Sequence, residues 1–173
     1  LIEDSKINGM STFKANDKID LTAKYGIINK LVYRGFTLIV FQTYKVTPIY
    51  INRSSQADVT GKESLIFSDK VMTIGNTPNE EWGTDLPASV ITYGNSIYFF
   101  DRHSAQWIWD AGNGLIPINN KMNKEFKLLS SKKQLDVVAW VNEFGEIIAN
   151  FSYKKANTEE EEEGESGNEE TKG

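Results

Sequence analysis

Side chains that could perform acid–base or nucleophilic chemistry gather near the middle of the chain. Asp101, His103 and Ser104 fall within one run of four residues, and Asp110 follows shortly after them. A serine hydrolase needs its serine, histidine and acid in one hydrogen-bonded relay, and a glycosidase needs two carboxyl groups about 5–10 Å apart. Adjacency along the chain fixes neither arrangement, and aspartate is common in turns because it binds nearby backbone amides. We therefore interpret Asp101 and Asp110 as turn residues, and His103 and Ser104 as a polar loop tip.

Two tryptophans, Trp107 and Trp109, lie two positions apart in the same stretch. On a β-strand this spacing puts both side chains on one face, because successive side chains alternate. Such a pair can form a sugar-binding platform or a protein contact, or it can pack beneath a neighbouring sheet. We favour packing, which predicts that both tryptophans are substantially buried and that Ile108 points the other way.

Several kinds of site lack the residues that they need. The chain has no cysteine and a single histidine, His103, which excludes disulfides, zinc–thiolate centres, cysteine nucleophiles and multi-histidine metal sites within it. The stretch DAGNG at 110–114 lacks the acidic repeat of a calcium loop, and no glycine-rich stretch carries the Gly-Lys-Ser/Thr of a phosphate loop. We predict no catalytic, cofactor-binding or metal-binding residue and no enzymatic activity.

The charge is concentrated at one end of the chain. The formal net charge is -5, but residues 157–173 carry eight Glu and one Lys, so the remainder is weakly basic at +2. A near-neutral body argues against a strongly basic nucleic-acid surface. The acidic segment at 156–173 has too little apolar surface to offset its ordering entropy, so we predict that it is disordered. No apolar run approaches the roughly 20 residues of a membrane-spanning helix.

The first half of the chain is rich in β-branched and aromatic residues. We expect an arm or strand at 1–17 and a short helix over Leu21–Tyr25, begun by Asp20 and ended by Gly26. Short strands separated by turn residues follow. Their predicted ranges are Leu31–Tyr33, Phe36–Gln42, Val46–Ile51, Leu65–Phe67 and Val71–Ile74, with a polar loop between Ile51 and Leu65.

The second half repeats this pattern with closer spacing. Four strands are predicted in 89–119, at Ser89–Tyr93, Ile97–Phe100, Gln106–Trp109 and Leu115–Ile118. Strands every 8–12 residues are typical of sandwiches, barrels and propellers. An amphipathic helix is expected around Met122, Phe126 and Leu129, which share one helical face. A hairpin pairs Val137–Val141 with Glu146–Tyr153.

The order of motifs between Lys18 and Phe151 resembles that of the stabilisation or muzzle proteins at the tail tip of crAss-like bacteriophages. Five stretches carry the likeness: AKYGIINKLVYRGFTLIVFQTYKV, DVTGKESLIFSDKVMTIG, WGTDLPASVITYGNSIYFFDRHSAQWIWDAGNGLIPIN, NKMNKEF and LDVVAWVNEFGEIIANFS. The third stretch is similar to the family's Gly-Thr-x-x-Pro-x-Ser-Val step, Tyr-Phe-x-Asp strand and Asn-Gly-Leu/Ile-x-Pro-Ile close. The chain departs from the family where Ala88 replaces a glutamate and where 140–144 replaces a Tyr-Asp-Pro turn.

The resemblance implies a mainly β protein: a partial β-propeller-like domain over 18–155, built of antiparallel blades with one or two short helices and one blade at 89–119. It implies a virion structural protein in the tail nozzle of a short-tailed phage, assembled around the channel through which DNA leaves. The implied partners are copies of the chain in a ring-like oligomer, other tail proteins such as ring, hub and fibre proteins, and genomic DNA in transit. We expect further blades beyond Gly173, because a single blade cannot bury its own face.

Two other functions fit the residues alone. The aromatic strand beside Asp101 and Asp110 is compatible with a carbohydrate-binding or carbohydrate-active β-domain. A β-domain of a bacterial surface protein that binds another protein is the third possibility.

Overall fold

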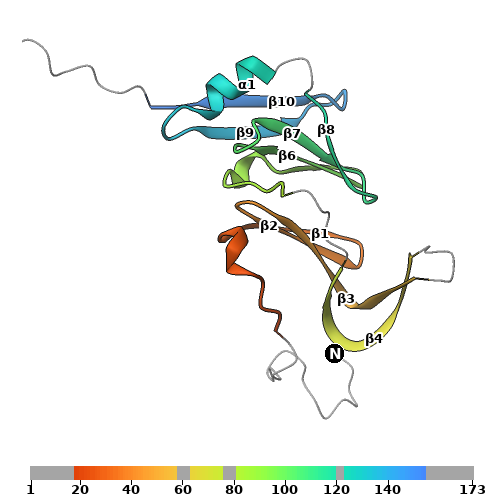
Figure 1. The fold of residues 1–173 in the computed structure, drawn as a ribbon. Helices are drawn as coiled ribbons and strands as arrows, with labels where there is room; N and C mark the ends of the chain where they lie inside the picture. Colours follow the sequence, from red (N-terminus) through yellow and green to blue (C-terminus); the bar gives the residue numbers. More distant parts are fainter. Residues whose placement is uncertain (1–17, 58–62, 76–80, 120–122, 155–173) are drawn as a thin grey trace, which may run out of the picture.

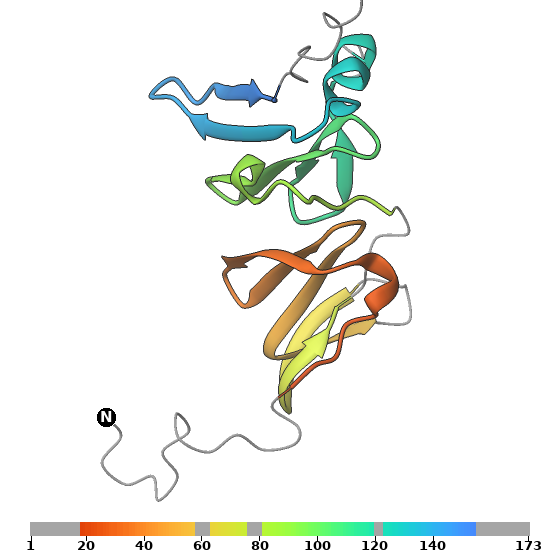
Figure 2. The same cartoon turned by 90° about the vertical axis from the view of Figure 1, so that its left-hand side faces the viewer.

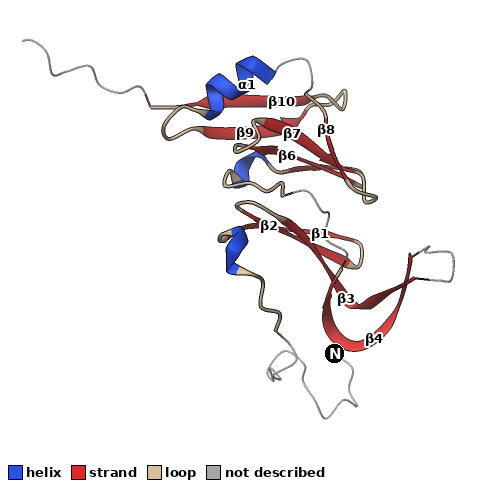
Figure 3. Ribbon diagram, viewed as in Figure 1, coloured by secondary structure: helices blue, strands red, loops and turns tan. Residues whose placement is uncertain are grey.

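Over its described residues the protein is mainly β, with three antiparallel sheets, one α-helix and short 3₁₀ turns. The structure is a computed structural model, and it describes residues 18–57, 63–75, 81–119 and 123–154. The predicted N-terminal arm at 1–17, the acidic segment and Met122 therefore lie outside the described residues. Figure 3 shows strands dominating every layer of the molecule, and none of its three sheets closes on itself within the described ranges.

The first sheet joins four consecutive strands in chain order, each antiparallel to the next. Its strands are β1 (Ile28–Arg34), β2 (Thr37–Gln42), β3 (Val46–Ala57) and β4 (Glu63–Ile74). The turn predicted at 43–45 is confirmed, and the turn predicted at 34–35 lies one residue later, at 35–36, because Arg34 still belongs to β1. Gly35 has a φ of 60°, a left-handed conformation that glycine adopts without the steric cost of a Cβ.

The sequence prediction was wrong about the polar stretch after Ile51. β3 continues through it to Ala57, and a single β4 replaces the two short strands expected at Leu65–Phe67 and Val71–Ile74. A register shift between Ile51 and Arg53 interrupts the pairing, and Asn52 there has a φ of 50°. Such bulges bend a strand, and the curved β3–β4 pair is plain in Figures 1 and 2.

The central sheet is a second meander of four strands in chain order. Its strands are β5 (Ile91–Tyr93), β6 (Ser96–Asp101), β7 (Gln106–Asp110) and β8 (Leu115–Pro117). All four strands predicted in 89–119 are therefore present, but the first begins two residues late because Pro87–Ser89 forms the 3₁₀ turn η3. The turns between the strands fall where glycine, asparagine and aspartate predicted them.

The third layer contains the C-terminal hairpin of β9 (Asp136–Val141) and β10 (Ile147–Ser152). The helix α1 (Asn123–Ser130) precedes it and places Phe126 in the core, as predicted. The helix expected at Leu21–Tyr25 is only the 3₁₀ turn η2 (Ala23–Tyr25), without a side-chain cap, and Gly26 ends it.

The layers stack in chain order, with the central sheet between the first sheet and the hairpin (Figures 1 and 2). One core fills the space between the first and central sheets, where the Phe41 and Phe99 rings meet edge to face at 5.1 Å. A second core lies between the central sheet, the hairpin and α1, and the Phe100 and Phe151 rings meet there at 5.3 Å. Burial of such large aromatic surfaces is the main stabilising contribution that these layers offer one another.

Truncation of Phe99 tests the first core, because its side chain is completely buried. We expect Phe99→Ala to lower the free energy of unfolding by about 3–5 kcal/mol, through lost burial and the cavity that remains. Urea unfolding followed by tryptophan fluorescence measures the change. Phe144→Ala is the matched control: its side chain is 79% exposed, so it should change stability by less than about 0.5 kcal/mol. If Phe99→Ala leaves no folded protein, Phe99→Leu should be folded but weaker; equal costs at both positions would contradict the packing.

Candidate functional site

The Asp101 turn, residues 101–105 between β6 and β7, holds the aspartate, histidine and serine whose types suggested catalysis. Asp101 is only 1% exposed. It accepts the backbone N–H of His103 at 2.9 Å and the Ser104 hydroxyl at 2.8 Å. The serine proton is therefore directed to the aspartate and not to the histidine, which is a different order from a hydrolase relay. The three residues form an aspartate-capped turn.

The His103 side chain has a packing contact between two layers. Its ring centre lies 4.4 Å from that of Tyr44, at an interplanar angle of 45°. Tyr44 belongs to the turn between β2 and β3, so the contact joins the first sheet to the central sheet. The histidine is thus placed by the Asp101 turn against a neighbouring layer.

Asp110 serves a second turn at the far end of the same sheet. One carboxylate oxygen accepts the N–H of Gly112 at 2.7 Å, and the other lies 3.1 Å from Nη1 of Arg34 on β1. Asp110 pairs with Ile97 at the start of β6, whereas Asp101 lies four residues further along that strand. Four residues of strand span about 13 Å, which exceeds the spacing of a catalytic carboxylate pair. The structure therefore does not bring the two aspartates together.

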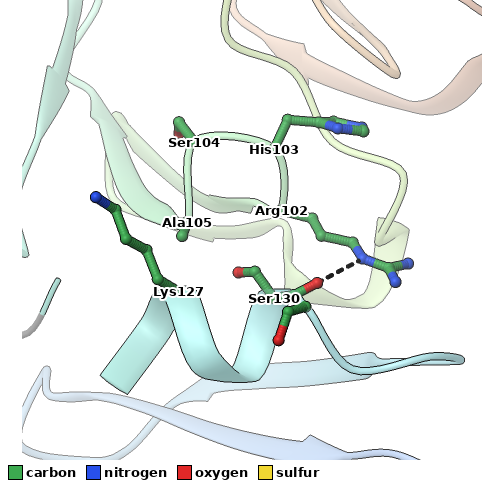
Figure 4. A pocket seen from close by; sticks show the side chains of 7 residues that line it. Arg102, His103, Ser104, Ala105, Lys127 and Ser130 are labelled. Carbon is green, nitrogen blue, oxygen red and sulfur yellow. Dashed lines mark hydrogen bonds between the residues drawn. The ribbon is translucent and has the colours of Figure 1, made fainter. Parts of the chain in front are cut away.

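An open recess lies beside the Asp101 turn, between that turn and the last turns of α1 (Figure 4). Its volume is about 320 Å³. Its lining is Arg102, His103, Ser104, Ala105, Lys127, Ser130 and Ser131. The recess is polar and cationic, and the sequence analysis did not anticipate it because α1 and the turn are distant along the chain.

Arg102 within the recess holds the end of α1. Its Nη2 donates to the Lys132 carbonyl at 2.9 Å and its Nε to the Ser130 carbonyl at 3.4 Å, and Nη1 lies 3.5 Å from Asp85. A cation at a helix C-terminus satisfies carbonyls that lack partners within the helix. The arginine is thus already committed to the protein itself.

The tryptophans pack as predicted. Trp107 is 6% exposed and contacts Phe100 at a ring distance of 5.5 Å. Trp109 is half-buried and stacks on Tyr98, with ring centres 6.3 Å apart and planes at 8°. Ile108 is completely buried in the opposite core. Trp107 is therefore covered by the third layer, and Trp109 packs on Tyr98 of its own sheet, which weakens the interpretation of the pair as a sugar platform.

Two buried hydroxyls, not predicted from the sequence as functional, bind the backbone of β6. Thr84 Oγ1 donates to the Phe100 carbonyl at 2.8 Å, and Ser89 Oγ accepts the Phe100 N–H at 3.2 Å. β5 pairs only with Ser96–Tyr98 of β6, so these hydroxyls satisfy the backbone groups that β5 does not reach. The signal was present in the Gly-Thr-x-x-Pro-x-Ser-Val step, whose threonine and serine are these two residues.

Comparisons with known proteins give no identity. A scan against protein-family models finds no match, and neither does a search of curated proteins or of solved structures. Within the described ranges, no helix is long and apolar enough to cross a membrane. No group of three or more histidine or acidic side chains in those ranges could hold a metal ion.

The buried Asp101 carboxylate predicts a pH dependence of stability. Burial raises its pKa above the ordinary value, although the hydrogen bonds from Ser104 and His103 oppose the shift. A carboxyl with a raised pKa in the folded state binds protons more tightly there, so its contribution to stability is full in acid and falls as pH rises through the folded pKa. Asp101→Asn keeps an oxygen for the His103 N–H and has no proton to lose.

We therefore expect the stability of the wild type relative to Asp101→Asn to fall with rising pH across the acidic range. Urea unfolding at a series of pH values measures this difference. Asp101→Ala, which removes both turn hydrogen bonds, should cost about 1–3 kcal/mol in acid, and this cost should fall with rising pH because alanine does not titrate either. Parallel pH profiles for the wild type and Asp101→Asn would show that burial does not perturb this carboxyl.

The Arg34–Asp110 pair predicts a second difference. Its side chains are 17% and 9% exposed, so Arg34→Met leaves a carboxylate largely out of water and should cost about 2 kcal/mol. Adding Asp110→Asn should recover part of this, since its oxygen still accepts the Gly112 N–H. Lys24→Met is the control, because the Lys24–Glu81 pair is exposed and such pairs contribute little. Equal effects of Arg34→Met and Lys24→Met in urea unfolding would contradict a structural role for the buried pair.

Proposed function

We propose that this chain is a non-catalytic structural module of a virion: part of a β-propeller in the tail nozzle of a short-tailed phage of the crAss-like type. The observation that carries the proposal is the stacking of two four-stranded antiparallel meanders in chain order, with a third layer begun by β9 and β10. Propeller blades are four-stranded sheets arranged in this way. In this proposal the central sheet is one blade, and the hairpin is the first half of the next.

The motifs behind the family resemblance support the proposal, because several of them occupy the joints between layers. The Gly-Thr-x-x-Pro-x-Ser-Val step holds the edge of β6 through Thr84 and Ser89. The Tyr-Phe-x-Asp strand leads into the Asp101 turn, where Arg102 donates to the Lys132 carbonyl just after the end of α1. In a family whose function is assembly, residues at these positions would serve to hold adjacent layers in place.

The polar groups in the middle of the chain also favour assembly over catalysis. Asp101 binds its own turn, and Asp110 binds Arg34 of the adjacent sheet. These interactions stabilise the stack and leave no preorganised nucleophile among them. The proposed partners are other copies of the chain, neighbouring tail proteins and, in transit, genomic DNA; the proposed location is the virion tail.

A protein-binding β-domain of a bacterial surface protein is the second candidate. The first sheet favours it, because Leu31 and Tyr33 on its edge strand β1 are 53% and 66% exposed. Exposed apolar side chains on an edge strand are suited to contact with another chain. A nozzle subunit needs such contacts as well, so localisation separates the two candidates better than the surface does.

The proposal predicts that the chain is present in mature particles. Trypsin should release residues 103–121, because cleavage follows Arg102 and Lys121. We expect this peptide in density-gradient-purified phage from the source culture, at a level comparable with other tail proteins, measured by quantitative mass spectrometry. Cell-envelope fractions from the same culture are the control. Recovery of the peptide from envelopes and not from particles would overturn the nozzle assignment and favour the surface-protein candidate.

A further inference from the structure

The loop between β7 and β8, residues 111–114, contains the dipeptide Asn113-Gly114. β7 ends at Asp110 and β8 begins at Leu115, and these two residues pair across the sheet. Gly114 has a φ of 138°, and a Cβ built on it would meet nothing within 4 Å. Asn113 is exposed. The strand pairing thus anchors both ends of the loop, while the space around Gly114 is free and the Asn113 side chain is exposed.

We propose that Asn113 is a site of spontaneous deamidation. The backbone nitrogen of Gly114 attacks the side-chain carbonyl carbon of Asn113 and forms a five-membered succinimide. The new N–C bond replaces the bond to the side-chain nitrogen, which leaves as ammonia and carries away the proton that the Gly114 nitrogen loses. Water then opens the ring at either carbonyl and gives aspartate or isoaspartate. The balance is one asparagine and one water converted to one acid and one ammonia, with no oxidant or reductant.

Two features of the loop favour the reaction at this dipeptide. Glycine has no side chain to hinder the approach of its nitrogen, and its backbone visits conformations that other residues avoid. The loop's own hydrogen bond uses the N–H of Gly112, which donates to Asp110. Within the described ranges, neither the Gly114 N–H nor the Asn113 carboxamide has a hydrogen bond that would restrain it.

The product changes the junction between the first and central sheets. A carboxylate at position 113 adds a second negative charge to the loop that Arg34 contacts through Asp110. Isoaspartate also lengthens the main chain by one methylene, between two residues whose pairing fixes the loop. Since Leu115 packs against the first core, isomerisation should loosen β8 and weaken that contact.

Another asparagine in the same tryptic peptide serves as an internal control. Asn119 is restrained at both ends of its carboxamide: Oδ1 accepts the Trp107 N–H at 2.8 Å, and Nδ2 donates to the Ala105 carbonyl at 3.3 Å. Asn120, not glycine, follows it. The structure therefore predicts that deamidation distinguishes Asn113 from Asn119 within one fragment.

The test is to incubate the full chain in mildly alkaline buffer, folded or unfolded in urea, and to map residues 103–121 by mass spectrometry with separation of the aspartate and isoaspartate forms. We expect both products at Asn113 in the folded protein, at a rate within about threefold of the unfolded chain, because the loop needs little opening. Asn119 should stay intact while the chain is folded. Asn113→Gln, which cannot close a five-membered ring, should abolish the signal. A folded-state rate more than about tenfold below the unfolded rate, or equal conversion at Asn119, would overturn the proposal.

Discussion

The structure depends on one constraint: the central sheet must be buried on both faces at once. Phe99 and Phe100 are consecutive on β6, and each is completely buried, in different cores. Strand side chains alternate between faces, so a half-covered sheet would leave one of these rings in water. The first sheet covers one face, and the hairpin with α1 covers the other. Neither neighbour can be removed without exposing an aromatic core.

Polar contacts set how the layers meet. Lys30 on β1 donates to the carbonyls of Pro87 and Val90, at 2.8 and 2.9 Å. Arg34, also on β1, forms an ion pair with the Asp110 carboxylate. The connection between the two sheets also runs against the first sheet's backbone. A Cβ built on Gly83 would lie 2.4 Å from the Gln42 carbonyl oxygen, so only glycine permits this approach. Apolar burial supplies the attraction between the sheets, and these contacts fix how one sheet is positioned on the other.

The sequence predicted the elements best where apolar runs end in turn residues. β5 ends at Tyr93 as predicted, and Gly94 and Asn95 form the turn to β6. The helix and hairpin after 120 also lie near their predicted positions. The prediction was wrong beyond Ile51. A two-stranded ribbon can run through polar residues when its backbone is paired, so the composition of that stretch does not indicate a strand. Turn propensity was right for Asp101 and Asp110, but local sequence cannot reveal that one is buried and the other meets Arg34. Those contacts come from residues distant along the chain.

The same distinction bears on function. An aspartate, a histidine and a serine in four residues resemble a hydrolase by composition alone. Catalysis depends on where each proton is directed. Here the Ser104 hydroxyl and the backbone N–H of His103 both donate to the buried Asp101 carboxylate. That carboxylate stabilises a turn, and the turn places His103 against Tyr44 of the neighbouring sheet. Asp101 and Ser104 thus act within their own turn, whereas His103 and Asp110 contact the neighbouring sheet. The contacts of His103 and Asp110 join stacked sheets, and they are the physical basis on which assembly is proposed as the function.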